Sequence, residues 1–135
     1  MALSYSEAIR NNMLAVVSTA ADVGPGATRL RLYTAPRPAA GGATTSLLAE
    51  LEMSDPTFGA PANGQITAGA ISPETSTPNS GTATWFRIVD GNGAFVLDGA
   101  VGLAGSGAEL ELGDVNILVG QEVRIALMTI TEGNA

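Results

Sequence analysis

The chain has 135 residues and a formal net charge of −7 at pH 7, and it contains no cysteine, histidine or lysine. Its length fits one domain with a sizeable core. The missing cysteine excludes disulfides, thiolate metal ligands and a cysteine nucleophile, and the missing histidine and lysine remove the usual bases near neutral pH. Six scattered arginines in an acidic chain do not form the cationic patch that nucleic acids require.

The sequence also argues against membrane contact. The longest apolar runs, such as Met13–Val17 and Ile125–Met128, are too short to span a bilayer. The first residues include Ser4, Ser6 and Glu7 and lack the basic and apolar regions of a signal peptide. We therefore expect a protein that is made in a cytoplasm and does not bind membranes.

The first predicted element is a helix within residues 1–24. Ser4 and Glu7 have the spacing of a capping box, and Gly24-Pro25-Gly26 ends the periodic pattern. An apolar stripe on one side of the helix is expected to be covered by the chain's own sheet or by a neighbouring molecule. The stripe consists of Ile9, Met13, Val16, Val17 and Ala20.

The next segments alternate apolar and charged residues as half-buried strands do. Thr28–Tyr33 exposes two arginines on the face away from its leucines, and Leu47–Met53 exposes two glutamates. If these strands pair, the charges form a cross-strand ladder on the wet face, worth roughly 0.2–1 kcal/mol per pair. The residues of this ladder are Arg29, Arg31, Glu50 and Glu52. Gln65–Ile71 is a weaker strand candidate.

The second half of the chain contains the best hairpin. Thr82–Val89 leads into Asp90-Gly91-Asn92-Gly93, a sequence that tolerates the positive φ angles of tight turns, and Ala94–Leu97 runs back. Further alternating strands are expected around Leu110 and Leu112, then Val115, Ile117 and Val119, then Val123, Ile125 and Leu127. The pattern predicts a mainly β fold, an antiparallel β-sandwich or open barrel with one N-terminal helix. We expect a single domain over residues 1–135, with the β-rich body at 27–135.

Three connections are long and rich in small residues or proline: Thr34–Thr45, Ser54–Gly64 and Ser72–Gly81. Loops of about a dozen residues are uncommon in compact domains unless they bind something or move. They are therefore candidate contact segments.

Polar motifs in the chain have simple structural interpretations. Asp90-Gly-Asn-Gly93 resembles the start of a calcium loop, but Val101 stands where the bidentate glutamate would be needed. Asp90 and Asp98 as paired carboxylates would lie on opposing parts of one hairpin, without cleft aromatics. Gly102–Gly107 lacks the ending of a phosphate loop and indicates a flexible turn. We predict no enzymatic activity and no catalytic, cofactor or metal site.

Trp85 and Phe86 fall on opposite faces of one strand. Core packing of both is the default, while one of them could instead be a contact residue or lie under the helix.

Strand-and-turn patterns over most of the chain, together with the N-terminal helix containing Arg10-Asn11, carry a family resemblance. The segments are Gly81–Asp90, Val96–Gly102, Ala108–Leu112, Val119–Ile125 and Thr129–Thr131. The chain resembles small virion structural proteins of tailed bacteriophages, some of which are similar to head decoration, or cement, proteins. These motifs have no chemical signature, and the middle loops, such as Pro73–Asn79, follow no recognised pattern of the group.

The resemblance implies a capsid decoration protein on the virion surface that binds the major capsid protein and stabilises the assembled head. It also implies a homo-oligomer, with a trimer as the natural geometry at three-fold positions. Within this hypothesis, Pro36, Arg37 and Pro38 are the candidate contacts with the shell. The alternatives are a tail- or fibre-associated adhesin with a carbohydrate-binding sandwich, a small carboxylate hydrolase and a generic secreted β domain. The missing signal peptide counts against the last of these.

Overall fold

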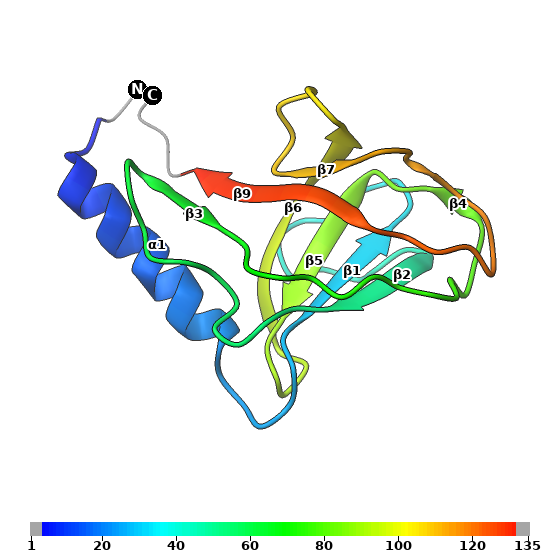
Figure 1. Cartoon of the computed structure of the whole chain (residues 1–135), viewed down its shortest axis with the longest axis horizontal. Coiled ribbons are helices and arrows are strands. Elements are labelled where there is room, and N and C mark those ends of the chain that lie inside the picture. Colours follow the sequence, from blue (N-terminus) through cyan, green and yellow to red (C-terminus); the bar gives the residue numbers. More distant parts are fainter. Residues whose placement is uncertain (1–3, 132–135) are drawn as a thin grey trace.

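The computed structural model describes residues 4–131, without the side chains of Ala126 and Leu127. It confirms the mainly β fold with one N-terminal helix (Figure 1). The predicted residues 1–3 and 132–135 of the domain, and the Leu127 side chain of the predicted last strand, lie outside this description. The elements in chain order are α1 (Glu7–Ala21), β1 (Arg29–Tyr33), β2 (Leu47–Glu52), β3 (Gln65–Thr67), β4 (Gly81–Thr82), β5 (Trp85–Val89), β6 (Phe95–Leu103), β7 (Leu110–Leu112), β8 (Asn116–Ile117) and β9 (Ile125–Thr131).

Helix α1 begins two residues later than its predicted cap. Ser6, not Ser4, is the N-cap, and its hydroxyl accepts a hydrogen bond from the Ile9 N–H at 3.3 Å. The predicted Ser4–Glu7 capping box is therefore wrong, because Ser6 has the extended backbone of an N-cap and its side chain provides the acceptor for the first turn. At the other end, the Asp22 carboxylate accepts from the N–H and the hydroxyl of Thr57, which ties the helix to the loop before β3.

The face of α1 that is buried differs from the predicted stripe. Leu14 and Ala21 are fully buried and Val17 packs against the core, whereas Ile9 and Val16 of the stripe are 46% and 69% exposed. Alanines and aliphatic residues lie on several sides of this helix, so periodicity alone did not identify the inner face. The prediction was thus wrong for Ile9 and Val16.

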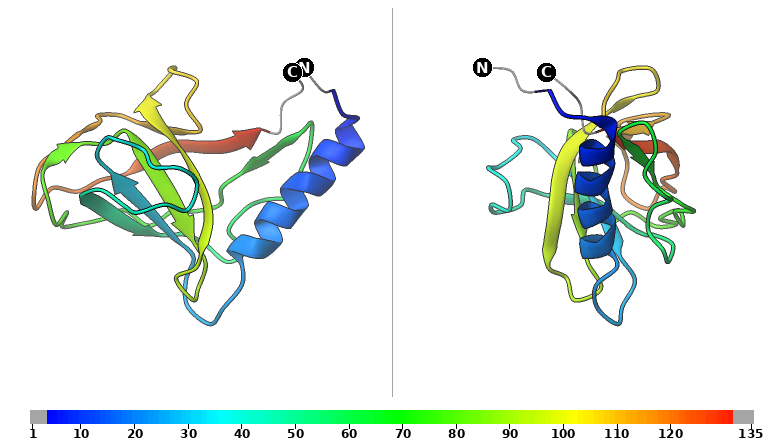
Figure 2. Two further views of the ribbon diagram at one scale, coloured as in Figure 1. Left: turned by 180° about the vertical axis from the view of Figure 1, so that it is seen from behind. Right: turned by 90° about the vertical axis from the view of Figure 1, so that its left-hand side faces the viewer.

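Helix α1 packs on the chain's own sheet. It contacts β3 and β6, and Figure 2 shows it lying across the space between these two strands. Asn11 on its inner side accepts the Gly64 N–H at 2.9 Å, just before β3. The helix therefore covers the side of the sheet on which β6 and β3 separate.

Seven strands form one sheet in the order β2-β1-β5-β6-β7-β9-β3, and β4 and β8 form a small second sheet. All pairs are antiparallel except β6 with β7, which is parallel. The predicted hairpin is present as β5–β6. Asp90 holds its turn, because one carboxylate oxygen accepts from the N–H groups of Asn92 and Ala94.

The sheet curls until its two ends meet, as expected for an open barrel. The segment that follows β3 returns along β2, where Met53 and Ile71 form an antiparallel bridge and Ser72 donates to the Glu52 carbonyl at 2.9 Å. The Glu74 carboxylate accepts the Glu50 N–H farther along the same edge. The edge of β2 is thereby protected from pairing with another molecule.

The parallel pair β6–β7 has a connection of only six residues, although parallel strands usually need a long crossover. Gly105 and Gly107 have positive φ angles of 85° and 83° and allow the sharp return. A Cβ on Gly102 would lie 2.4 Å from the Ser106 hydroxyl, so the return also crosses closely over β6. The predicted glycine-rich turn is therefore the feature that makes β6 and β7 parallel.

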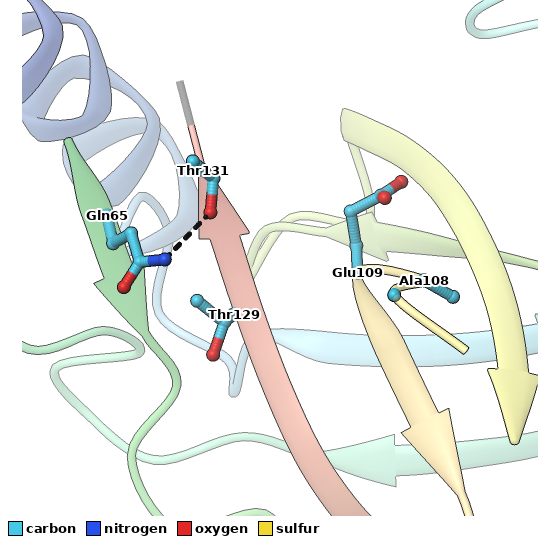
Figure 3. Close-up of a pocket in the computed structure, with 6 residues that line it drawn as sticks. Gln65, Ala108, Glu109, Thr129 and Thr131 are labelled. Atoms are coloured by element: carbon cyan, nitrogen blue, oxygen red, sulfur yellow. Dashed lines mark hydrogen bonds between the residues drawn. The ribbon is translucent and has the colours of Figure 1, made fainter. Parts of the chain in front are cut away.

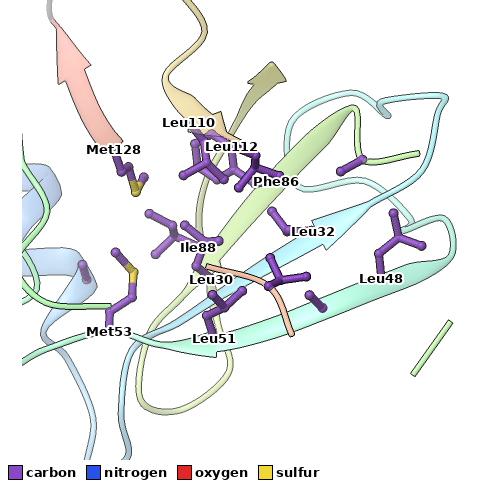
Figure 4. Packing of buried hydrophobic residues seen from close by; sticks show 14 of the residues in the cluster. Leu30, Leu32, Leu48, Leu51, Met53, Phe86, Ile88, Leu110, Leu112 and Met128 are labelled. Atoms are coloured by element: carbon purple, nitrogen blue, oxygen red, sulfur yellow. The ribbon is translucent and has the colours of Figure 1, made fainter. Parts of the chain in front are cut away.

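The enclosed core is contributed by most of the strands (Figure 4). Leu30 and Leu32 of β1, Phe86 and Ile88 of β5, and Met128 of β9 point into the same interior. Each fully buried side chain of this kind contributes roughly 1.5–3 kcal/mol relative to an exposed one.

Several strand boundaries differ from the prediction, and β3 ends at Thr67 instead of the predicted Ile71. Thr82–Val89 is divided into β4 and β5, and β6 runs six residues beyond the predicted end at Leu97. Val119 lies in a turn after β8 and not in a strand. Within residues 4–131, no helix has both the length and the apolar character needed to cross a bilayer.

On the outer face, the predicted ladder is confirmed. Strands β1 and β2 pair, and Glu50 binds Arg29 at 3.0 Å and Arg31 at 2.7 Å, while Glu52 lies 3.3 Å from Arg29. These side chains are about one-third to one-half exposed, so the pairs contribute little individually.

The pairing of β5 with β6 places Phe86 opposite Gly99. A methyl group on Gly99 would lie 2.4 Å from Phe86 Cε1, and Phe86 is fully buried and cannot move aside. We expect Gly99→Ala to lower the free energy of unfolding by about 1–3 kcal/mol. Gly113→Ala is the control, since nothing lies within 4 Å of a Cβ there. Urea denaturation would measure both variants, and equal stabilities would contradict the packing of Phe86 on Gly99.

Candidate functional site

The outer face of β1, β5 and β6 carries a second, aromatic cluster. The rings of Tyr33 and Trp85 stack at 4.6 Å between centroids, and the Arg87 guanidinium lies 5.3 Å from the Trp85 ring and 5.1 Å from the Phe95 ring. Trp85 is fully buried on this face while Phe86 enters the core, so both aromatic residues of the strand are packed inside the fold. Stacking and cation–π contacts stabilise this arrangement.

A buried ion pair lies at the centre of this cluster. Arg87 Nε donates to Asp98 Oδ1 at 2.7 Å and its Nη2 donates to Oδ2 at 3.0 Å, and the two side chains are only 9% and 1% exposed. The hydrogen bonds to Asp98 raise the pKa of Arg87 above its ordinary value, against the opposing effect of burial. Such a two-point contact fixes both side chains in one geometry.

The β1–β2 loop, residues 34–46, covers the cluster and is bound by the same ion pair. The Gly42 carbonyl accepts from Arg87 at 2.9 Å, and the Gly41 N–H donates to Asp98 at 3.3 Å. The Trp85 indole N–H donates to the Thr34 carbonyl at 2.8 Å. The loop is therefore attached to the sheet at several points.

The predicted contact residues Pro36, Arg37 and Pro38 lie in this loop. Pro36 and Arg37 are exposed and Pro38 is half-buried. Arg37 Nη2 donates to the main-chain oxygen of Asp98 at 3.1 Å. Whether these residues contact a shell stays a prediction, but Arg37 already has a structural role on β6.

That role concerns the part of β6 that precedes its pairing with β7. Arg37 binds the Asp98 carbonyl, and the Glu109 carboxylate accepts the Ala100 N–H at 3.1 Å. Side chains thus satisfy backbone groups on a strand edge that has no neighbouring strand there.

Beside this edge lies a hollow of about 470 Å³, lined by Gln65, Gly107, Ala108, Glu109, Thr129 and Thr131 (Figure 3). Gln65 and Thr131 meet across β3 and β9 at 3.2 Å. Among the described residues of this lining, Glu109 alone carries a carboxylate, and it accepts the Ala100 N–H. These described residues do not offer the second carboxylate that glycoside hydrolysis requires.

Asp90 and Asp98, which the sequence analysis considered as a catalytic pair, have separate structural roles. Asp90 holds the hairpin turn, and Asp98 is occupied by Arg87 and by the loop. Across residues 4–131, no group of three or more acidic residues gathers as metal ligands.

The most exposed aliphatic residues lie in two places, while Ile9, Val23 and Leu103 are 46%, 47% and 50% exposed. One is the outer side of α1, where Val16 lies in a shallow apolar hollow with Ala15, Thr19 and Ala20. The other is the turn after β8, where Leu118 and Val119 are 66% and 63% exposed.

The sequence pattern extended a strand through Val119, which lies in the turn, and it gave no sign of the buried ion pair. Val119 was assigned to a strand because Val115, Ile117 and Val119 alternate, although Gly120 directly afterwards signalled a turn. The pairing of Arg87 with Asp98 depends on the register of β5 on β6, which the hairpin sequence does not specify by itself.

No family model, curated protein sequence or solved structure matches the chain.

Removing one partner of the buried ion pair leaves the other charge without compensation. We expect Asp98→Ala to lower the free energy of unfolding by about 3–5 kcal/mol and to increase cleavage within the β1–β2 loop. The control is Arg124→Met, which breaks an exposed pair with Glu122 and costs less than about 1 kcal/mol. Thermal denaturation and limited proteolysis measure the two effects, and an unchanged cleavage rate in the loop would contradict the attachment.

Proposed function

We propose that the chain is a non-catalytic structural protein of a tailed-bacteriophage particle, and specifically a head decoration protein that binds the assembled shell. The observation that carries this proposal is that the acidic side chains of the candidate sites are engaged within the fold, whereas some aliphatic side chains are exposed. The acidic side chains of the candidate sites hold turns, loops and strand edges, whereas the aliphatic side chains of Leu118 and Val119 project from the surface. Such a molecule is suited to binding rather than to chemistry.

Charge supports a protein partner with basic groups. The chain carries 13 acidic and 6 basic residues, and within residues 4–131 at least four of the six arginines pair with carboxylates of the chain itself. The remaining surface is acidic, so it complements a cationic partner surface. In the proposal, binding to the assembled shell in preference to free subunits stabilises the head by mass action.

The adhesin alternative receives less support. A carbohydrate site of the aromatic type needs accessible ring faces, but Trp85 is fully buried and Tyr33 stacks on it beneath the β1–β2 loop. Of this cluster only Phe95 is substantially exposed, and its ring is next to Arg87.

The test is to mix purified protein with phage heads that lack it and to image the particles by cryo-electron microscopy. We expect ordered, symmetric occupancy on the shell and a higher temperature of head disruption. Tail-only particles serve as the control. Bare heads, or binding to tails or to a glycan array instead, would contradict the proposal.

A further inference from the structure

The turn that follows β8 lies at the end of the molecule remote from α1 (Figure 1). It carries two exposed aliphatic side chains. Leu118 and Val119 are adjacent in sequence, and each is about two-thirds exposed. Turn positions usually carry glycine, asparagine, aspartate or serine, so two branched aliphatic residues at such a position require an explanation.

The backbone of this turn is held by Thr77 and Ser80 of the segment before β4 and by its own Gln121. The N–H of Leu118 donates to the Gln121 side-chain oxygen and that of Val119 donates to the Ser80 hydroxyl, both at 2.8 Å. The N–H of Gly120 donates to the Thr77 carbonyl at 2.8 Å. The N–H of Gln121 donates to the Leu118 carbonyl at 3.1 Å and to the Thr77 hydroxyl at 3.2 Å.

All four backbone N–H groups of residues 118–121 therefore have acceptors, and the Leu118 carbonyl also accepts from the Thr77 hydroxyl at 2.6 Å. Thr77 is buried, so the turn is attached to the body of the fold. A surface that is held in one geometry before binding loses less conformational entropy when it binds.

The surroundings of the turn are acidic. A hollow of about 300 Å³ begins at Gln121 and is lined by Asp114, Glu122 and Arg124 as its charged residues. Arg124 pairs with Glu122 at 2.6 Å, which leaves the Asp114 charge without an ion-pair partner among the described residues. A cation on a partner would complement this hollow.

We propose that Leu118 and Val119 form the anchor of a protein–protein contact, and that they insert into an apolar pocket flanked by arginine or lysine on the shell. This inference rests on the proposed function and specifies the surface that carries it. Aliphatic anchors in a pocket, with charges at the rim, are the arrangement in which a few residues supply most of the binding energy.

The charges beside the turn favour a shell surface with basic groups as the partner, over an anionic membrane or a second copy of the chain. Anionic lipid surfaces repel Asp114 and Glu122, so the turn is unsuited to inserting into such membranes. A second copy could offer the apolar hollow on α1, but Glu7 and Asp22 at the ends of that helix carry the same sign as the hollow beside the turn. A shell surface with basic groups has neither disadvantage.

The experiment compares Leu118→Ser/Val119→Ser with Val16→Ser, which removes an equally exposed aliphatic side chain from α1. Both variants should keep the wild-type melting temperature within a few degrees, because neither position is buried. We expect the double variant to bind heads lacking the protein at least tenfold more weakly, and Val16→Ser to bind as wild type. Occupancy of the wild type should also fall as salt is raised from about 50 to 300 mM.

Each outcome separates the two proposals. If the wild type leaves heads bare, the proposed function fails and the inference fails with it. If wild type and double variant occupy heads equally, only the inference fails. Sedimentation in which the double variant and Val16→Ser both dissociate an oligomer would overturn it in favour of a second copy. Binding of the wild type, but not of the double variant, to phosphatidylserine vesicles would overturn it in favour of a membrane.

Discussion

The register between β5 and β6 determines both faces of the sheet. It places Phe86 opposite Gly99 on the inner side and Arg87 opposite Asp98 on the outer side. Because successive residues of a strand point to opposite faces, a slip by one position would remove the ring from its glycine and the guanidinium from its carboxylate together. The Asp90 turn and its attachment to the connection after α1, where Gly91 donates to the Val23 carbonyl at 2.8 Å, reinforce this register.

Two further parts of the fold depend on this hairpin. The ion pair between Arg87 and Asp98 on the outer face attaches the β1–β2 loop. Strand β6 contacts α1 and pairs with β7. Closure of the sheet then brings the segment after β3 against β2. A chain of this size thereby buries one core without disulfides, and it uses polar side chains chiefly to satisfy loops and strand edges.

The sequence allowed the class of fold, the single helix and the β1–β2 charge ladder to be predicted, because these depend on local periodicity. The inner face of α1 could not be predicted, since Leu14 and Ala21 compete with Ile9 and Val16 and only tertiary packing decides between them. The parallel pair β6–β7 was not foreseen, because six-residue connections between parallel strands are rare. For the candidate site, Arg37 lies in the long loop that the sequence predicted, and its contact with a shell stays a prediction. Its bond to Asp98 could not be predicted, because the two residues are 61 positions apart in the chain.

The difference between local periodicity and tertiary packing also explains why Val119 was assigned to a strand although it lies in the turn after β8. Alternation of Val115, Ile117 and Val119 has the appearance of a strand, and folding places only Ile117 of these in the core. Thr77, Ser80 and Gln121 would stabilise the turn equally well if residues 118 and 119 were polar, because they bind its backbone. The fold therefore does not require aliphatic side chains at these two positions. Their exposure contributes nothing to the core, and the proposed contact with a partner outside the chain would give them a role.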